Sequence, residues 1–435
     1  MEPVRRALLE KAKAFYTTFV EQSAGDPELL YKLGKAHERL GTIVRHLGDP
    51  AAAAAEYERS RLAFSQLLND HKHVPLYALD LAHSFNNLGI TLSDLGKNEE
   101  AIQLYEKEIL ILEKLSKGHP NEPDYAASLA VSYNNLAGSL SDLGKADQAI
   151  DFHNKAIPIK KQLVNNHPDM PAYAEDLARS YSNLAVSLND LGKTGEAIEF
   201  HNKAILTREQ LVKDDSDMHD YAASLADSYN GLAVSLSDLG KTDEAIEFYS
   251  KAILIRDQLV KDHPDLPAYA IRLTRAYNNL GEALYESGKT NEALELHNKT
   301  IPTIELLVKD HPGVPHYFAS LSDSYHALGR TLAGLGQLNE AVNAYHKAIA
   351  VREQLVEDQP AMPEYQESLI LLYVMIGSTM RQLGDKDEAI GFLSKAINAG
   401  QILVQDHPGV PGYAKALGGA YMSIGIAFHG SGQLV

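Results

Sequence analysis

Asparagine recurs every 48 residues in two adjacent columns, a column being a set of positions separated by multiples of 48. The first column, directly before a leucine, contains Asn87, Asn135, Asn183 and Asn279, with Gly231 interrupting it. The second column, one residue earlier, contains Asn86, Asn134, Asn230 and Asn278. A carboxamide both donates and accepts hydrogen bonds, so it can pair with a peptide group whatever side chain accompanies that group. Asparagine is a poor helix former, so its recurrence has either a ligand-binding reason or a structural one, such as bonding between neighbouring helices.

Charged and apolar residues occupy further positions of the same segments. The column two residues after the leucine contains small or apolar residues in the earlier repeats and charged residues in the later ones. Its members are Ile90, Gly138, Val186, Val234, Glu282 and Arg330. Together with Arg275, the two charged members are candidates for selecting ligand side chains or a terminal carboxylate. Ordinary surface charge is the alternative explanation.

Histidines also recur, but not in a way that predicts a metal site. His119, His167, His263, His311 and His407 each precede a proline, once per period. Packed helices lie about 8–10 Å apart, whereas metal–nitrogen bonds are about 2 Å long, so two such histidines cannot share an ion. A histidine at a helix C-terminus is favoured by the helix dipole. His153, His201 and His297 share a column with tyrosines, which predicts a packing role.

No catalytic constellation stands out. An active site needs one unique arrangement of acid, base and nucleophile, yet each such residue here recurs as a column. The sequence has no phosphate-binding loop, no His-Glu-x-x-His motif and no cysteine. We therefore expect no enzyme activity, no cofactor and no bound metal.

The 48-residue period extends along the whole chain. Glycine falls at its consecutive multiples: Gly48, Gly96, Gly144, Gly192, Gly240, Gly288, Gly336, Gly384 and Gly432. An alanine follows five residues after the first eight of these glycines, and an aromatic residue precedes most of them by eleven. A fixed period of this length is typical of a repeat protein.

Each period has the pattern of two helices. Tyr173, Leu177, Tyr181, Leu184 and Leu188 recur at spacings of three and four, which is one face of a helix. The period glycine supplies the positive φ favoured at helix ends, and the connector prolines end the second helix and begin the next first helix. No segment alternates with period two. The sequence therefore predicts an all-α fold.

These columns resemble the tetratricopeptide repeat signature of aromatic, leucine, small, large, glycine, alanine, aromatic and alanine residues. The best match is Phe85, Leu88, Gly89, Leu92, Gly96, Ala101 and Tyr105. The usual repeat has about 34 residues, so this one is elongated. The Asp-His-Pro-x-x-Pro-x-Tyr connector followed by Ser-Tyr-Asn-Asn-Leu is similar to the long repeats attached to bacterial serine/threonine kinases, although no kinase signature is present.

The resemblance implies a right-handed superhelical solenoid of antiparallel helix pairs whose first helices line the inner, concave face. The first asparagine column, hereafter the asparagine ladder, also resembles the ladder of the O-linked N-acetylglucosamine transferase repeat domain, where asparagine holds the backbone of an extended peptide. We therefore expect a protein-interaction scaffold that binds an extended peptide in its groove.

Composition narrows the partners and the compartment. The chain has 435 residues with 40 Lys and Arg against 58 Asp and Glu, a net charge of −18. Nucleic-acid binders normally carry a basic patch, and anionic lipid repels an acidic surface. The longest apolar stretch, 369–380, is too short to span a bilayer. We expect a cytoplasmic protein with neither nucleic-acid nor membrane partners.

The positions of both chain ends within the 48-residue period predict that the chain forms one solenoid of about 18 helices. Its parts are a leading helix within residues 1–26, eight full repeats over 27–416, and a lone first helix of a ninth repeat over 417–435. Solenoids normally end in a polar cap, and the last helix lacks one. Homo-association through that helix, head to tail, is therefore an alternative role. The chain would then be a structural spacer or self-assembling array, or a regulatory region of a kinase absent from it.

Overall fold

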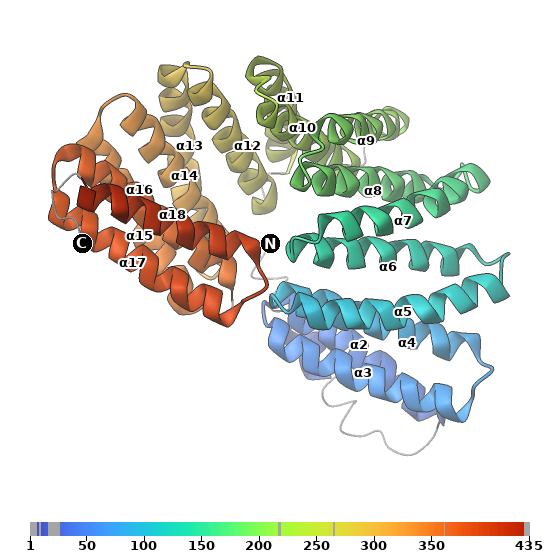
Figure 1. The fold of residues 1–435 in the computed structure, drawn as a ribbon. Coiled ribbons are helices and arrows are strands. Elements are labelled where there is room, and N and C mark those ends of the chain that lie inside the picture. The colour runs from blue at the N-terminus through green and yellow to red at the C-terminus, as the bar shows by residue number, and fades with distance from the viewer. Residues whose placement is uncertain are drawn as a thin grey trace. The chain divides into compact units, whose positions relative to one another are not determined.

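The computed structural model describes residues 7, 10–15, 27–215, 219–263, 266–360 and 362–429. All regular secondary structure in these ranges is helical, and none of their residues lies in a strand (Figure 1). Seventeen helices are described, and residues 10–15 are helical as well. The all-α prediction is confirmed. Apart from residue 7, the rest of the leading segment 1–26 lies outside the described residues.

The helices alternate between two types with nearly constant lengths. The first helices are α2 (Pro27–His46), α4 (Pro75–Asp94), α6 (Pro123–Asp142), α8 (Pro171–Asp190), α10 (His219–Asp238), α12 (Pro267–Glu286), α14 (Pro315–Gly334), α16 (Pro363–Leu383) and α18 (Pro411–His429). The second helices are α3 (Pro50–Asp70), α5 (Asn98–Gly118), α7 (Ala146–Asn166), α9 (Thr194–Asp214), α11 (Thr242–Asp262), α13 (Thr290–Asp310), α15 (Leu338–Asp358) and α17 (Lys386–Asp406).

The period glycine ends each first helix as predicted. Eight of the nine have φ between 70° and 91°, and Gly432 lies outside the described residues. At Gly192, the glycine N–H donates to the Asn189 carbonyl and the Lys193 N–H donates to the Leu188 carbonyl, both at 2.8 Å. These bonds satisfy carbonyls that the end of a helix leaves without partners.

The two helices of a repeat approach closely where a small residue faces an aromatic ring. A Cβ added to Gly89 of α4 would lie 2.6 Å from the Tyr105 ring of α5. The same approach recurs between Gly329 and Tyr345. Burial of these rings and of the alanine column, of which Ala101 and Ala149 are fully buried, forms the core between the helices.

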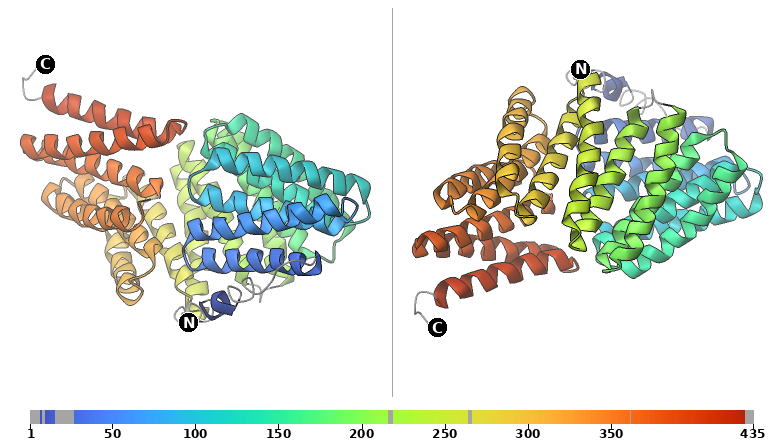
Figure 2. Two further views of the ribbon diagram at one scale, coloured as in Figure 1. Left: turned by 90° about the horizontal axis from the view of Figure 1, so that it is seen from below. Right: turned by 90° about the horizontal axis from the view of Figure 1, so that it is seen from above.

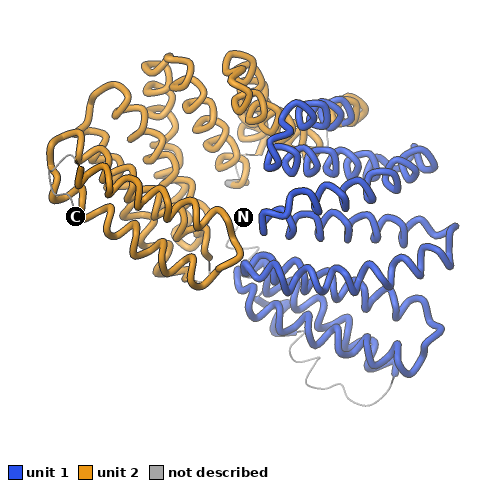
Figure 3. The backbone as a smooth tube through the Cα atoms, in the orientation of Figure 1, with its two compact units in different colours: residues 1–207 blue, residues 208–435 orange. Residues whose placement is uncertain are grey.

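The chain divides into two compact units, residues 1–207 and 208–435 (Figure 3). Within each unit successive helices lie side by side (Figure 2). The closest contacts between helices that are not consecutive in the chain join first helices. They are α4 with α6 and α6 with α8 in unit 1, and α12 with α14, α14 with α16 and α16 with α18 in unit 2. First helices therefore form a layer of their own in each unit, as the inner-face prediction requires.

The last helix begins at Pro411, six residues before the expected boundary at 417. The eighth repeat accordingly ends with the connector before Pro411. Because the two units are described separately, a single continuous solenoid over residues 1–435 stays a prediction. In the part of the chain that the structure describes, no helix is long and apolar enough to cross a bilayer.

Candidate functional site

Two members of the asparagine ladder bond to the second asparagine column of the preceding repeat. The Asn135 Nδ2 of α6 donates to the Asn86 Oδ1 of α4 at 2.8 Å. The Asn279 Nδ2 of α12 donates to the Asn230 Oδ1 of α10 at 2.9 Å. Each bond holds two carboxamides together on neighbouring first helices. Among the described residues, it leaves one acceptor oxygen and one donor nitrogen without a second hydrogen-bond partner.

The other two ladder members make no such bond. Asn87 on α4 is half-buried and Asn183 on α8 is exposed. Neither side chain has a hydrogen bond within the described residues. Both carboxamides are therefore available to a ligand without first breaking an internal contact.

Two members of the second column have structural bonds. Asn134 is buried, donates to Ser180 Oγ at 2.6 Å and lies 3.1 Å from His153 Nδ1. Burial lowers the pKa of His153 to about 4, so this ring is neutral at physiological pH. Asn278 donates to Ser324 at 3.0 Å. These bonds join neighbouring repeats and occupy the two amide nitrogens.

The predicted groove charges are partly neutralised. Glu282 Oε1 and Arg330 Nη2 form an ion pair at 2.5 Å, and the Arg330 guanidinium lies 5.7 Å from the Tyr285 ring centroid. In the apolar half, Val186 and Val234 are exposed and Ile90 is half-buried. Apolar contact is thus available at these three positions, whereas Glu282 and Arg330 largely satisfy each other.

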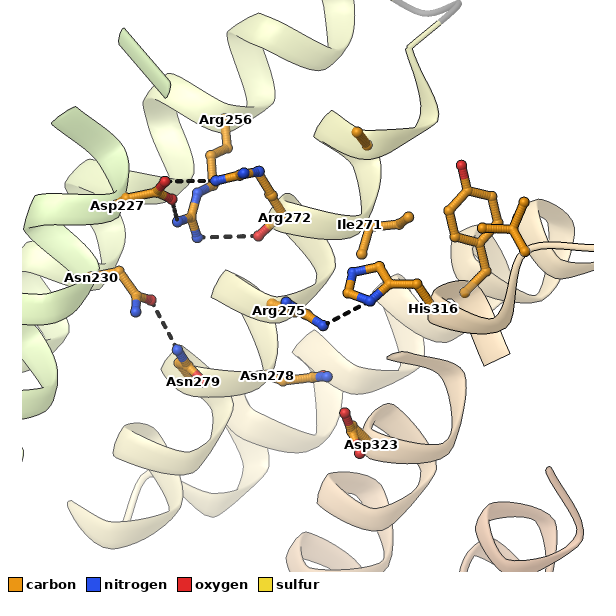
Figure 4. A pocket seen from close by; sticks show the side chains of 13 residues that line it. Asp227, Asn230, Arg256, Ile271, Arg272, Arg275, Asn278, Asn279, His316 and Asp323 are labelled. Atoms are coloured by element: carbon orange, nitrogen blue, oxygen red, sulfur yellow. Dashed lines mark hydrogen bonds and ion pairs between the residues drawn. The ribbon is translucent and has the colours of Figure 1, made fainter. Parts of the chain in front are cut away.

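A cavity of about 790 Å³ lies in unit 2 among α10, α11, α12 and α14 (Figure 4). This volume is in the range of small-molecule and peptide side-chain sites. The linked pair Asn230 and Asn279 lines it, together with Arg275 from the groove prediction. The cavity therefore brings the polar ladder and a charged groove residue to one place.

Asp227 is the centre of an ion-pair network in this cavity. Its Oδ1 accepts from Arg256 Nη2 at 2.7 Å, and its Oδ2 accepts from Arg272 Nη1 at 2.6 Å. Arg256 also donates from Nη1 to the Arg272 carbonyl at 3.1 Å. The same pairing recurs two repeats later, where the buried Arg352 bonds Asp323. The two carboxylates are thereby fixed by guanidinium groups.

The sequence interpretation missed the cations of this network because they come from second helices. Their column begins with Phe64 and Leu112 and then contains the buried Lys160, Arg208, Arg256 and Arg352. The sequence signal was a run of lysine and arginine in a column whose first members are apolar core residues. A buried cation requires partners, so it indicates a polar network between first and second helices.

The connector histidines follow the last residues of second helices, as predicted, and they also pack against aromatic rings. Each stacks edge-on or tilted against a tyrosine six residues later, as His119 does with Tyr125 at a centroid distance of 5.7 Å. His153, His201 and His297 are buried in the aromatic column. Among the described residues, no group of three or more His, Asp or Glu side chains is arranged to hold a metal ion.

Models of the tetratricopeptide repeat family match residues 80–162, 177–217, 224–305, 272–354 and 371–399. No curated protein sequence matches the chain.

Several solved structures are similar to the chain. A Rap protein complexed with Competence and Sporulation Factor has a TM-score of 0.52 and 14% identity, over 93% of this chain and 98% of that one. The apo form of RapI has a TM-score of 0.50 and 13% identity, over 74% and 99%. BtubC (BKLC) from P. vanneervenii has a TM-score of 0.47 and 20% identity, over 59% and 92%. At these identities the likeness concerns the fold.

The family matches cover more than half of the chain and coincide with the helix pairs of the structure. The chain therefore belongs to the tetratricopeptide repeat family.

Proposed function

We propose that this tetratricopeptide repeat array is a protein-interaction scaffold whose first helices hold an extended peptide by its backbone. The proposal rests on one observation, the hydrogen bonds that link Asn135 to Asn86 and Asn279 to Asn230. In each pair one internal bond fixes both side chains and leaves a donor and an acceptor for a ligand.

A peptide group needs both kinds of partner. Its carbonyl can accept from the free amide nitrogen of Asn86, and its N–H can donate to the carboxamide oxygen of Asn135. A buried peptide group left without a hydrogen-bond partner costs about 1–3 kcal/mol. Contacts with the asparagines favour binding because they avoid this cost. They are independent of the ligand side chains, which favours recognition of an extended backbone.

Apolar positions beside the ladder complement the polar ones. Val186 and Val234 are exposed on first helices, close in sequence to the asparagine columns. Removing apolar surface from water contributes about 25 cal/mol per Å². We expect small apolar ligand side chains to pack at these positions, with the backbone held by asparagine.

One structural neighbour agrees with a role in partner binding. The Rap protein that shares this fold was solved in complex with Competence and Sporulation Factor. The shared fold lends support to a scaffold role for this chain, while the asparagine pairs give the reason to place the ligand on first helices.

A display selection of random twelve-residue peptides on the purified full chain tests the proposal. Hydrogen exchange with and without a recovered peptide should then show protection on first helices such as α4, α6 and α12. Protection confined to second helices, or failure to recover any peptide, would contradict the proposal.

A second candidate function, self-association, is favoured by one observation on α18. Tyr421 and Met422 are 47% and 68% exposed, whereas Tyr373 and Val374, their equivalents in α16, are 6% and 8% exposed. In α16 this face packs against α17, and Tyr373 contacts Phe392 there. A second copy that supplies an equivalent helix would cover the same face in α18.

A further inference from the structure

Two histidines from different columns of the repeat lie in contact in unit 2. His219 is the first residue of α10, and His263 directly follows the last residue of α11. Their ring centroids lie 4.0 Å apart, and the ring planes are inclined by 62°. Because α10 and α11 are joined at the Gly240 turn, the two histidines lie together at the opposite, open end of this helix pair.

The sequence has this combination in a single repeat. Proline opens the other eight described first helices, so His219 replaces a proline. The position 44 residues later, where His263 lies, contains histidine in six of the eight repeats. The sequence argument against a shared ion compared connector histidines with one another, at equivalent positions. It did not cover a histidine in the proline column.

Both imidazole rings are accessible to a ligand. His219 is exposed and His263 is half-buried. Within the described residues neither ring has a hydrogen bond or an ion pair, and the other ring contact of His263 is with Tyr269 at a centroid distance of 5.8 Å. A neutral imidazole has one nitrogen with a free lone pair, and this nitrogen is a common ligand of zinc, copper and nickel ions.

The separation of the rings is close to that of two ligands on one ion. Metal–nitrogen bonds of about 2.0–2.1 Å place each ring centroid about 3.2 Å from the ion, so two rings at a right angle around it have centroids about 4.5 Å apart. The observed separation is 4.0 Å. Rotation about the side-chain bonds of two partly accessible residues is enough to supply the difference.

The same two positions line a cavity in other repeats. In unit 1, Pro123 and His167 line a cavity of about 450 Å³. In unit 2, Pro315 and Gln359 line a cavity of about 240 Å³. A recess at the open end of a helix pair thus recurs in both units. An ion bound at these positions can keep water molecules as its remaining ligands.

We propose that His219 and His263 together bind one Zn²⁺ ion, with water completing its coordination. Their chain neighbours Asp220 and Asp262 add negative charge that favours a cation. The ion links the start of α10 to the end of α11, opposite the Gly240 turn. Because this arrangement of ligands exists in the folded chain, zinc binding stabilises the helix pair. The proposal does not depend on peptide binding.

Calorimetric titration of Zn²⁺ into the full chain without an affinity tag tests the site. His219→Pro and His263→Gln each introduce the residue that another repeat has at that position, so both variants should fold. Each should bind Zn²⁺ at the tightest site at least tenfold more weakly than wild type. His167→Gln makes the same change as His263→Gln at the equivalent position of unit 1, and this control should bind as wild type does.

A second substitution tests the geometry by building the site elsewhere. Pro123→His places a histidine opposite His167 in unit 1, as His219 is placed opposite His263. This variant should bind a second Zn²⁺ ion with an affinity within tenfold of the first. Pro123→His combined with His167→Gln should bind one ion, as wild type does.

Thermal melting in the presence of Zn²⁺ or of EDTA gives an independent readout. Zn²⁺ should raise the melting temperature of wild type and should have a smaller effect on His219→Pro. Equal Zn²⁺ affinities of wild type and His219→Pro would overturn the site. A loss of affinity in one of the two single variants alone, or a Pro123→His variant that gains no ion, would also overturn it.

Discussion

At the scale of single residues, this array contains ionisable groups in positions that are core elsewhere in the repeat. Glu108 of α5 is 2% exposed in a column that otherwise contains alanine, serine and threonine. One of its oxygens accepts from Ser132 at 2.6 Å, and the other has no hydrogen-bond partner within the described residues. Burial raises the pKa of Glu108 to about 8. The folded protein therefore holds a proton that the unfolded chain releases near pH 4.5.

The pH dependence of stability follows from that difference. Because the folded pKa is raised, the stabilisation is present below about pH 4.5 and is lost as pH rises toward 8. Glu108→Gln removes this loss, so at pH 8 the variant should be more stable than wild type by about 1–3 kcal/mol, the cost of a poorly satisfied buried group. At pH 4 the two should nearly coincide. Urea unfolding at both pH values measures the difference.

A comparison with an exposed glutamate of the same helix isolates the effect of burial. Glu106→Gln makes the same chemical change at an exposed position of α5 and is the control for the substitution itself. The pKa of His153 is lowered to about 4, so this residue makes stability fall as the solution becomes acidic, the opposite of the Glu108 effect. The contribution of His153 is the same in all variants and cancels when two variants are compared. Equal stabilities of wild type and Glu108→Gln at pH 8 would show that this carboxyl is not the source of the dependence.

Sequence reasoning identified the asparagines but not how they are used. The two columns were visible as separate patterns, whereas the structure joins Asn135 to Asn86, which are 49 residues apart. A column analysis compares equivalent positions and does not show contacts between non-equivalent ones. The Asp227 network was missed for the same reason, since Arg256 and Asp227 belong to different helix types.

At the scale of helices, the sequence predicted nearly every boundary in the described ranges. Proline at the first helical position and glycine shortly after the last one are local signals, so most first helices are bounded by their own residues. The start of α18 at Pro411 was the exception, because the expected boundary ignored the connector proline that opens every other described first helix except α10. How the repeats stack depends on non-local packing, which the period alone does not specify.

A pair of glycine substitutions tests the helix-end assignment. Gly192 has φ of 75° and Gly138 has an ordinary helical conformation, and an added Cβ would meet nothing within 4 Å at either position. Gly192→Ala should destabilise unit 1 by about 1–2 kcal/mol because an L-residue is strained at positive φ. Gly138→Ala should stabilise it by about 0.5–1 kcal/mol through helix propensity.

Chemical denaturation followed by circular dichroism measures both variants. The two substitutions add the same methyl group to open space, so conformation is the variable that distinguishes them. Equal effects of the two variants would contradict the role of positive φ at the end of α8.

At the scale of the whole molecule, the exposed face of α18 bears on association. If a second copy covers Tyr421 and Met422, the apparent mass from light scattering should rise with protein concentration. Tyr421→Glu should abolish that rise, because a charge in an apolar contact carries a large desolvation cost. Leu254→Glu, at an exposed leucine of α11, is the control and should leave the mass unchanged from wild type.

A constant monomer mass for wild type across the accessible concentrations would remove the self-association role. It would leave the scaffold function untouched, because the asparagine pairs and the unit 2 cavity lie on other helices.

In our proposal, asparagines on first helices bind the ligand backbone, both in the linked pairs and at Asn87 and Asn183. Calorimetric titration of a selected peptide into Asn87→Ala/Asn183→Ala tests it most directly, because neither side chain has an internal hydrogen bond to lose. The control is Asn134→Ala, whose side chain bonds Ser180 and His153. We predict that the double variant melts like wild type and binds at least tenfold more weakly, a loss of about 1.4 kcal/mol. Asn134→Ala should melt lower and bind nearly as wild type, whereas unchanged affinity in the double variant would contradict the account.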